Sequence, residues 1–163
     1  MGQSYCKVGR LQGEWTSYCL ISAHLRSIMP AKDRHHDAVV RALKKDGWII
    51  TKEQVRLTYG DRYMWIDLRA EKQANQRVIL IEVKELDDVN SPIDALASAL
   101  GKYLLYRMGL KAAGADLPLY MAVTEAAYNG ILSSDVGVQT INEFDIALLV
   151  FDPVQEVIIR WIT

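Results

Sequence analysis

The segment Ile81-Glu82-Val83-Lys84 places a carboxylate and an amine two residues apart in an apolar stretch typical of a β-strand. Side chains of a strand alternate between its two faces, so Glu82 and Lys84 are expected on one face. Asp67 ends an earlier apolar strand, and pairing of the two strands would bring it beside Glu82. Two converging carboxylates predict a site for Mg²⁺, which prefers oxygen ligands, or for Mn²⁺.

Such a site suits hydrolysis of a phosphodiester. Asp67 and Glu82 would hold the ion, which polarises a phosphate and lowers the pKa of a bound water. Lys84 would orient that water and offset the charge that develops on the phosphate. The simpler interpretation is a solvated ion pair between Glu82 and Lys84, worth less than about 1 kcal/mol.

The elements around these residues follow from the apolar periodicity. A helix is expected from Asp33, as its cap, to a stop at Gly47, and a short strand is expected over 48–51. Alternation over 62–68 predicts a strand with Tyr63, Trp65 and Asp67 on one face. Further elements are a hairpin connection at 71–76, a strand at 77–85, a helix from Ser91-Pro92 to about 110, a strand at 119–124, helical pieces near 125–132 and 138–143, and strands at 145–151 and 156–162.

Composition limits the function. Nineteen Lys and Arg against twenty Asp and Glu give a formal net charge of -1. A protein that binds nucleic acid mainly by electrostatics is usually strongly basic, so any DNA contact must use a local patch. Two cysteines are too few for a disulfide scaffold, and no apolar run is long enough for a membrane span. We therefore expect a cytoplasmic protein with no membrane association.

The first 28 residues differ from the rest. They show no clear period, and Met29-Pro30-Ala31-Lys32-Asp33 resembles a second start. Residues 1–28 are expected to be an N-terminal extension, either a wrongly assigned start or a poorly ordered arm. A functional arm remains the alternative. Residues 29–163 are expected to form a single α/β domain.

The order αβββαβ, with the acidic motif on the second and third strands, resembles the restriction-endonuclease-like core of the PD-(D/E)XK nuclease superfamily. More narrowly, residues 29–163 resemble the XisH family, the fdxN element excision-controlling factors of cyanobacteria. The residues that carry this likeness are Ala31-Lys32-Asp33 with His36, Leu43-Lys44-Lys45-Asp46-Gly47-Trp48, Ile66-Asp67-Leu68, Ile81-Glu82-Val83-Lys84, and Ala99-Leu100-Gly101-Lys102-Tyr103 with Tyr106-Arg107.

The resemblance implies a fold with a mixed central sheet flanked by helices and extra C-terminal strands. It implies a factor that works with a site-specific recombinase and a small companion protein to excise a DNA element. A Mg²⁺-dependent DNA endonuclease that pairs as a homodimer is one form of that role. A catalytically inactive nuclease fold that binds DNA or a partner protein is the other, because fold alone does not decide activity.

Two departures from the superfamily pattern concern auxiliary positions. Many members carry a Glu on the first helix where this chain has His36, which can bind a metal only when neutral. The alternative for His36 is a packed, hydrogen-bonded core residue. Lys102 stands where related nucleases often have Gln, with Tyr106 one turn later. Lys102 would add positive charge beside a phosphate path, or it is an ordinary surface lysine.

Overall fold

The computed structural model describes the backbone of residues 7–11 and 14–18 and all of residues 34–163. Strands β1 (Lys7–Leu11) and β2 (Glu14–Tyr18) form a small antiparallel sheet of their own. The sequence pattern of the first 28 residues did not predict these strands. Among the described residues, no helix is both long and apolar enough to cross a membrane.

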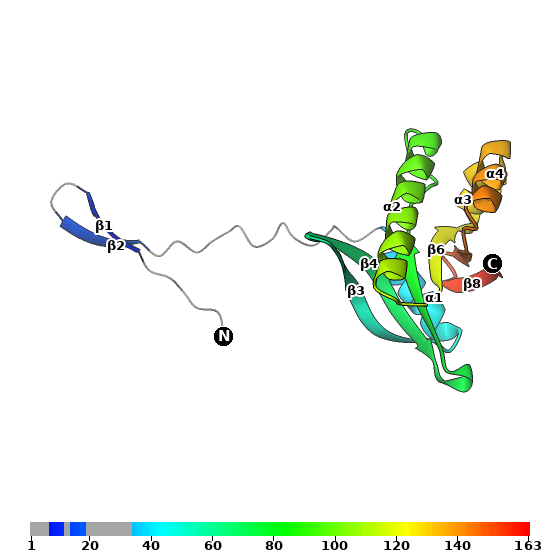
Figure 1. The fold of residues 1–163 in the computed structure, drawn as a ribbon. Coiled ribbons are helices and arrows are strands. Elements are labelled where there is room, and N and C mark those ends of the chain that lie inside the picture. The colour runs from blue at the N-terminus through cyan, green and yellow to red at the C-terminus, as the bar shows by residue number, and fades with distance from the viewer. Residues whose placement is uncertain (1–6, 12–13, 19–33) are drawn as a thin grey trace. The chain divides into compact units, whose positions relative to one another are not determined.

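Residues 34–163 contain a six-stranded mixed sheet whose strands lie side by side in chain order (Figure 1). The third, fourth and fifth strands are parallel to one another. The first strand pairs antiparallel with the second, the second with the third, and the fifth with the sixth. The strands are β3 (Ile49–Tyr59), β4 (Arg62–Lys72), β5 (Arg77–Val83), β6 (Leu119–Thr124), β7 (Leu148–Asp152) and β8 (Val157–Ile162).

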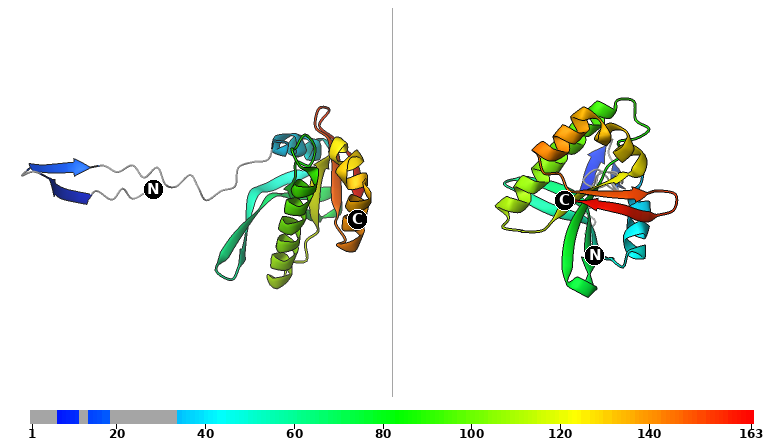
Figure 2. Two further views of the ribbon diagram at one scale, coloured as in Figure 1. Left: turned by 90° about the horizontal axis from the view of Figure 1, so that it is seen from above. Right: turned by 90° about the vertical axis from the view of Figure 1, so that its right-hand side faces the viewer.

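Helices cover both faces of this sheet (Figure 2). Helix α1 packs one face, over a core that includes Leu43, Ile81 and Phe151. The other face packs mainly against α2, over a core that includes Leu80 and Tyr103. The helices are α1 (His36–Lys45), α2 (Pro92–Ala112), α3 (Glu125–Asn129) and α4 (Asp135–Glu143), with short 3-10 turns η2 (Gln73–Asn75) and η3 (Ile131–Ser133). The predicted αβββαβ order with extra C-terminal strands is confirmed.

Two predicted helix boundaries have the expected causes. The α1 helix ends before Gly47, whose φ of 80° is the left-handed conformation that favours glycine. The α2 helix begins after Ser91, whose side chain accepts a hydrogen bond from the backbone N–H of Asp94. The predicted cap of α1, Asp33, lies outside the described residues.

The prediction of a short strand over 48–51 was wrong, because β3 continues to Tyr59. Its polar middle contains an irregular register after Ile50 and a left-handed residue, Gln54, with φ of 53°. These irregularities are typical of β-bulges, and they break the alternation by which a strand is recognised in a sequence.

The β3–β4 hairpin also changes face at this point. Glu53 contacts His36 of α1, whereas Val55 packs on the α2 side. On the paired strand, Ile66 belongs to the α2 core and Leu68 to the α1 core. Residues two apart in a regular strand share a face, so the alternation predicted through Leu68 breaks at Asp67. Asp67 therefore occupies the irregular position that bulges often create beside a site.

Candidate active site

Asp67 lies where β4 separates from β5. The pairing of these strands ends at Leu68 and Ile81. Beyond that pair, Asp67 Oδ2 accepts a hydrogen bond of 2.9 Å from the backbone N–H of Val83. Its other oxygen, Oδ1, lies 3.4 Å from Nε2 of Gln54, which donates to it. The carboxylate of a β4 residue thus fixes the carboxyl end of β5.

Glu82 is the most enclosed charged residue of this region, with 1% of its surface exposed. Its Oε1 atom accepts hydrogen bonds from Lys84 Nζ at 2.7 Å and from Lys102 Nζ at 3.2 Å. Its Oε2 atom is buried and has no hydrogen-bond partner. Burial raises the pKa of the Glu82 carboxyl group, the charge of Lys84 lowers it, and the charge of Asp67 raises it further.

Lys84 lies on the same face as Glu82, as the alternation predicted. Its backbone N–H donates to the carbonyl of Ala122 at 2.9 Å, which ties the residue to β6. Its Nζ atom donates to the carbonyl of Val83 at 3.0 Å as well as to Glu82. Strand pairing and two acceptors therefore hold the amine at the end of β5.

Helix α2 brings Lys102 and Tyr106, one turn apart, to the same cluster. Lys102 binds Glu82 and is partly exposed. The buried Tyr106 hydroxyl donates to the carbonyl of Trp65 at 2.5 Å, which joins α2 to β4 two residues before Asp67. Burial raises the pKa of Tyr106, and the nearby charges of Glu82 and Asp67 raise it further. Five of the six predicted site residues thus come together.

His36 is the sixth, and its surroundings differ. It is buried in α1, and its Nε2 atom lies 3.1 Å from Oε2 of Glu53 on β3. Its Nδ1 atom has no hydrogen-bond partner. A buried histidine packed between a helix and a strand and bonded to a carboxylate is what the core interpretation of His36 predicts.

Gln54 is the residue of this region that the sequence did not reveal. It is buried, it donates to Asp67, and its Oε1 atom has no hydrogen-bond partner. Glutamine rarely adopts a positive φ, so nothing in the sequence marks this position as a bulge. Gln54 also follows other polar residues in the sequence, so nothing distinguishes it as a buried side chain.

The donor set fits a divalent cation held by two carboxylates. Within residues 34–163, no group of three or more His, Cys, Asp or Glu side chains could hold a metal ion. Mg²⁺ commonly binds one or two carboxylates and keeps several waters, so Asp67 and Glu82 are sufficient. Oε2 of Glu82 supports the fit, because a buried acceptor without a partner costs about 1–3 kcal/mol.

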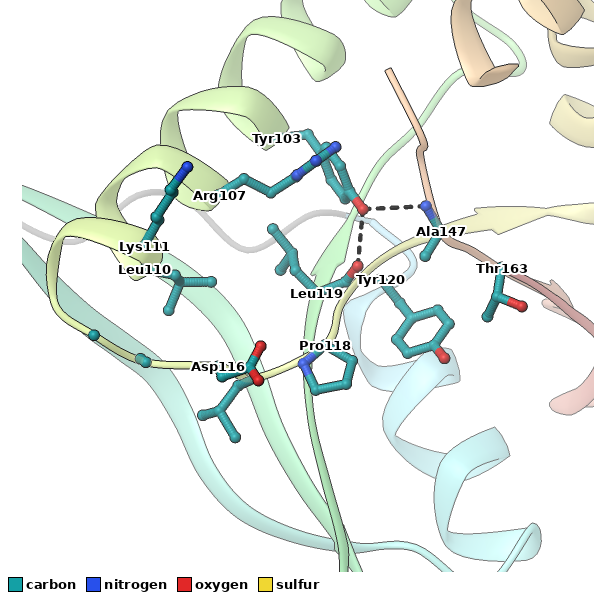
Figure 3. Close-up of a pocket in the computed structure, with 13 residues that line it drawn as sticks. Tyr103, Arg107, Leu110, Lys111, Asp116, Pro118, Leu119, Tyr120, Ala147 and Thr163 are labelled. Carbon is teal, nitrogen blue, oxygen red and sulfur yellow. Dashed lines mark hydrogen bonds between the residues drawn. The ribbon is translucent and has the colours of Figure 1, made fainter. Parts of the chain in front are cut away.

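A large cavity lies elsewhere. It has a volume of about 700 Å³ and is bordered by the carboxyl half of α2 and the start of β6, including Arg107, Lys111 and Asp116 (Figure 3). The buried Tyr103 hydroxyl at its edge is already satisfied, since it donates to the carbonyl of Leu119 and accepts from the N–H of Ala147. None of the five clustered residues lines this cavity. The chemistry of the cluster, and not cavity size, therefore identifies the candidate site.

A family model and two solved structures point to one family. The family model described as XisH protein matches residues 29–159. Comparison with curated proteins gave no match. The crystal structure of an XisH family protein from Nostoc punctiforme PCC 73102 is 32% identical, with a TM-score of 0.74 over 80% of this chain and 100% of that one. That of a fdxN element excision controlling factor protein from Anabaena variabilis is 35% identical, with a TM-score of 0.75 over 81% of this chain and 100% of that one. The chain belongs to the XisH family.

Proposed function

We propose that this protein is a factor controlling excision of a DNA element and that it hydrolyses DNA phosphodiesters with Mg²⁺. The family supports the first part, because a solved relative of known fold is a fdxN element excision controlling factor. The observation that carries the second part is the Glu82 carboxylate, buried beside Asp67 with one oxygen unpartnered. Mn²⁺ is expected to substitute, since it takes the same oxygen ligands.

Each residue of the cluster has a distinct task in this proposal. Asp67 and Glu82 hold the ion, which supplies Lewis-acid polarisation of a phosphate and a more acidic bound water. Lys84, held at the end of β5, offsets negative charge on the phosphate. Lys102 reaches the same Glu82 oxygen from a partly exposed position, so it extends positive charge toward an approaching DNA strand. Tyr106 positions β4 through the carbonyl of Trp65.

A second function is favoured by the charge balance of the same cluster. The amines of Lys84 and Lys102 both bind Glu82, and Asp67 lies close enough for its charge to raise the pKa of Glu82. Two carboxylates and two amines thus leave the cluster neutral without any ion. Buried charges that already neutralise one another need no metal for stability. This balance suits a catalytically inactive nuclease fold that binds DNA or a partner protein.

A cleavage assay separates these functions. Supercoiled, single-stranded and branched DNA are incubated with the full chain in Mg²⁺, Mn²⁺ or chelator. The nuclease proposal predicts metal-dependent cleavage that Glu82→Gln and Lys84→Ala abolish. The exposed Glu125 and Lys44 provide matched controls, so Glu125→Gln and Lys44→Ala should cleave normally. Cleavage that survives Glu82→Gln would show a contaminating nuclease and contradict the proposal.

A role in excision also requires that the protein acts together with other molecules. We expect DNA, a small companion protein and a site-specific recombinase to act with this chain in the cytoplasm of a cyanobacterial cell. A pull-down of the companion with wild-type protein and with Glu82→Gln tests the scaffold function. Assembly unaffected by the substitution, together with no cleavage, would favour the inactive factor. Assembly that requires Glu82 would contradict a scaffold independent of the site.

A further inference from the structure

Helix α2 is apolar on two opposite faces. Its buried face packs on the sheet through residues spaced alternately three and four apart: Leu96, Ala99, Tyr103, Tyr106 and Leu110. The opposite face, which we call the outer face, has the same spacing: Ala97, Gly101, Leu104 and Met108, with Leu105 beside them. A helix that is buried on one side only usually has polar residues on the opposite side. The apolar outer face of α2 therefore indicates that a partner covers it.

Large apolar side chains gather at this face. The exposed fraction is 50% for Leu105, 44% for Met108 and 50% for Ile93 at the start of the helix. Phe144, at the end of α4, is 38% exposed. A groove of about 390 Å³ lies between Leu104 and Met108 on one side and Phe144 on the other. Contiguous exposed apolar patches of this kind usually mark interaction surfaces.

We propose that the outer face of α2 binds the same face of a second copy of this chain, with the two helices antiparallel. The face is self-complementary in that orientation. A twofold axis near the middle of the helix places Ala97 opposite Met108 and Gly101 opposite Leu104, so each large side chain meets a small residue. Repeated three- and four-residue spacing is the pattern by which helices interlock.

Charge selects the antiparallel orientation. The same alignment brings Asp94, near the start of α2, close to Lys111 near its end, at both ends of the interface. A parallel alignment would place Asp94 against Asp94 and Lys111 against Lys111, which is unfavourable. The isologous pairing of one surface with itself is the geometry of a twofold dimer.

The groove beside α2 receives a residue in this arrangement. In an antiparallel twofold pair, the same flank of each helix meets its counterpart. Ile93 of one copy then lies level with Lys111 of the other, beside the groove that Met108 and Phe144 border. Arg107 donates to the carbonyl of Phe144, which holds α4 against α2 and keeps this groove formed. An otherwise exposed Ile93 would thus be covered.

The dimer places the two candidate sites on either side of its axis. Gly101 and Leu105 face outward, while their neighbours Lys102 and Tyr106 turn toward Glu82 and Trp65. The inference uses only the shape and charge of α2 and of the groove beside it, so it stands or fails independently of any nuclease activity.

Analytical ultracentrifugation of the full chain over a concentration series tests the proposal. We expect a dimer of twice the 18.4 kDa chain mass that dissociates on dilution. Gly101→Arg is the sharpest variant, because no atom lies within 4 Å of a Cβ at this position. Arg also favours a helix more than Gly does, so the fold should remain intact while the close approach is blocked. We expect Gly101→Arg to be monomeric.

A control and a second set of variants complete the test. Val154→Arg, at an 88% exposed turn residue, should dimerise as the wild type does. Asp94→Lys should raise the dimer dissociation constant about two- to fivefold, and adding Lys111→Glu should restore it. A monomeric wild type up to about 100 μM, where even a weak specific interface should form, would overturn the proposal. So would a Gly101→Arg chain that dimerises normally and shows wild-type circular dichroism.

Discussion

Replacing Tyr106 by Phe removes one oxygen atom from the contact between α2 and β4. The lost hydroxyl donates to the carbonyl of Trp65 at 2.5 Å, and the tyrosine is buried. The carbonyl is then left without its donor. A buried polar group left unsatisfied costs about 1–3 kcal/mol. For a chain of this size, we expect a fall in melting temperature of roughly 2–12 °C.

The same substitution should affect the candidate site. Trp65 precedes Asp67 by two residues, and the hydrogen bond fixes this part of β4. Loss of the bond lets Asp67 move, and such supporting contacts usually change metal affinity about tenfold or more. We therefore expect Tyr106→Phe to weaken Mn²⁺ binding, measured by titration calorimetry, as well as stability.

Tyr103 on the same helix provides the matched control. Its buried hydroxyl bonds to Leu119 and Ala147, at the opposite end of the sheet from Lys84. Tyr103→Phe should therefore lose stability by a similar amount and keep its Mn²⁺ affinity. Urea unfolding with an unchanged m value gives both stabilities. A Tyr106→Phe chain within about 0.5 kcal/mol of wild type, a typical surface effect, would refute the role assigned to this bond.

Three further predictions concern other residues. His36→Gln should lower the unfolding free energy by about 1–3 kcal/mol, because the buried imidazole loses its packing in the core and its hydrogen bond to Glu53, but should leave Mn²⁺ affinity unchanged; weaker binding would place His36 in the site. Gly137→Ala should destabilise by at least about 1–3 kcal/mol, because its Cβ would collide with the backbone carbonyl of Ile131; an unchanged melting temperature would contradict this packing. Burial raises the pKa of Glu82, so in chelator its contribution to stability is present at low pH and is lost as pH rises through the raised folded pKa. The unfolding free energy of Glu82→Gln, measured by urea unfolding between roughly pH 4 and 8, should lack this loss. A pH dependence identical to that of the wild type would contradict the prediction.

The convergence of Asp67, Glu82 and Lys84 could be predicted because it follows from strand periodicity and one hairpin. The β4 and β5 strands are adjacent in the chain and apolar, so their pairing and the face of each side chain follow from local rules. Lys102 and Tyr106 could be expected near them only through the family resemblance. Their contact with β4 and β5 depends on how α2 packs, which the sequence pattern of the helix does not specify.

The irregular part of β3 could not be predicted. Bulges are recognised in sequences by glycine or asparagine, and this chain has Gln54 at the left-handed position. The change of face between Ile66 and Leu68 follows from that residue, and it determines how Asp67 enters the site. The partner of His36 was equally hidden, because Glu53 reaches α1 only after the hairpin has changed face.

The most direct test of the account is Mn²⁺ binding to the full chain, measured by electron paramagnetic resonance with matched Asp67→Asn and Glu82→Gln variants. These substitutions keep the shape of each side chain, remove its charge and replace one acceptor oxygen by an amide nitrogen. The account predicts a site in the wild type that both variants lose, with Glu125→Gln binding as the wild type does. An absence of Mn²⁺ binding to the wild type, or binding that persists in both variants, would contradict the metal site on which the proposed activity depends.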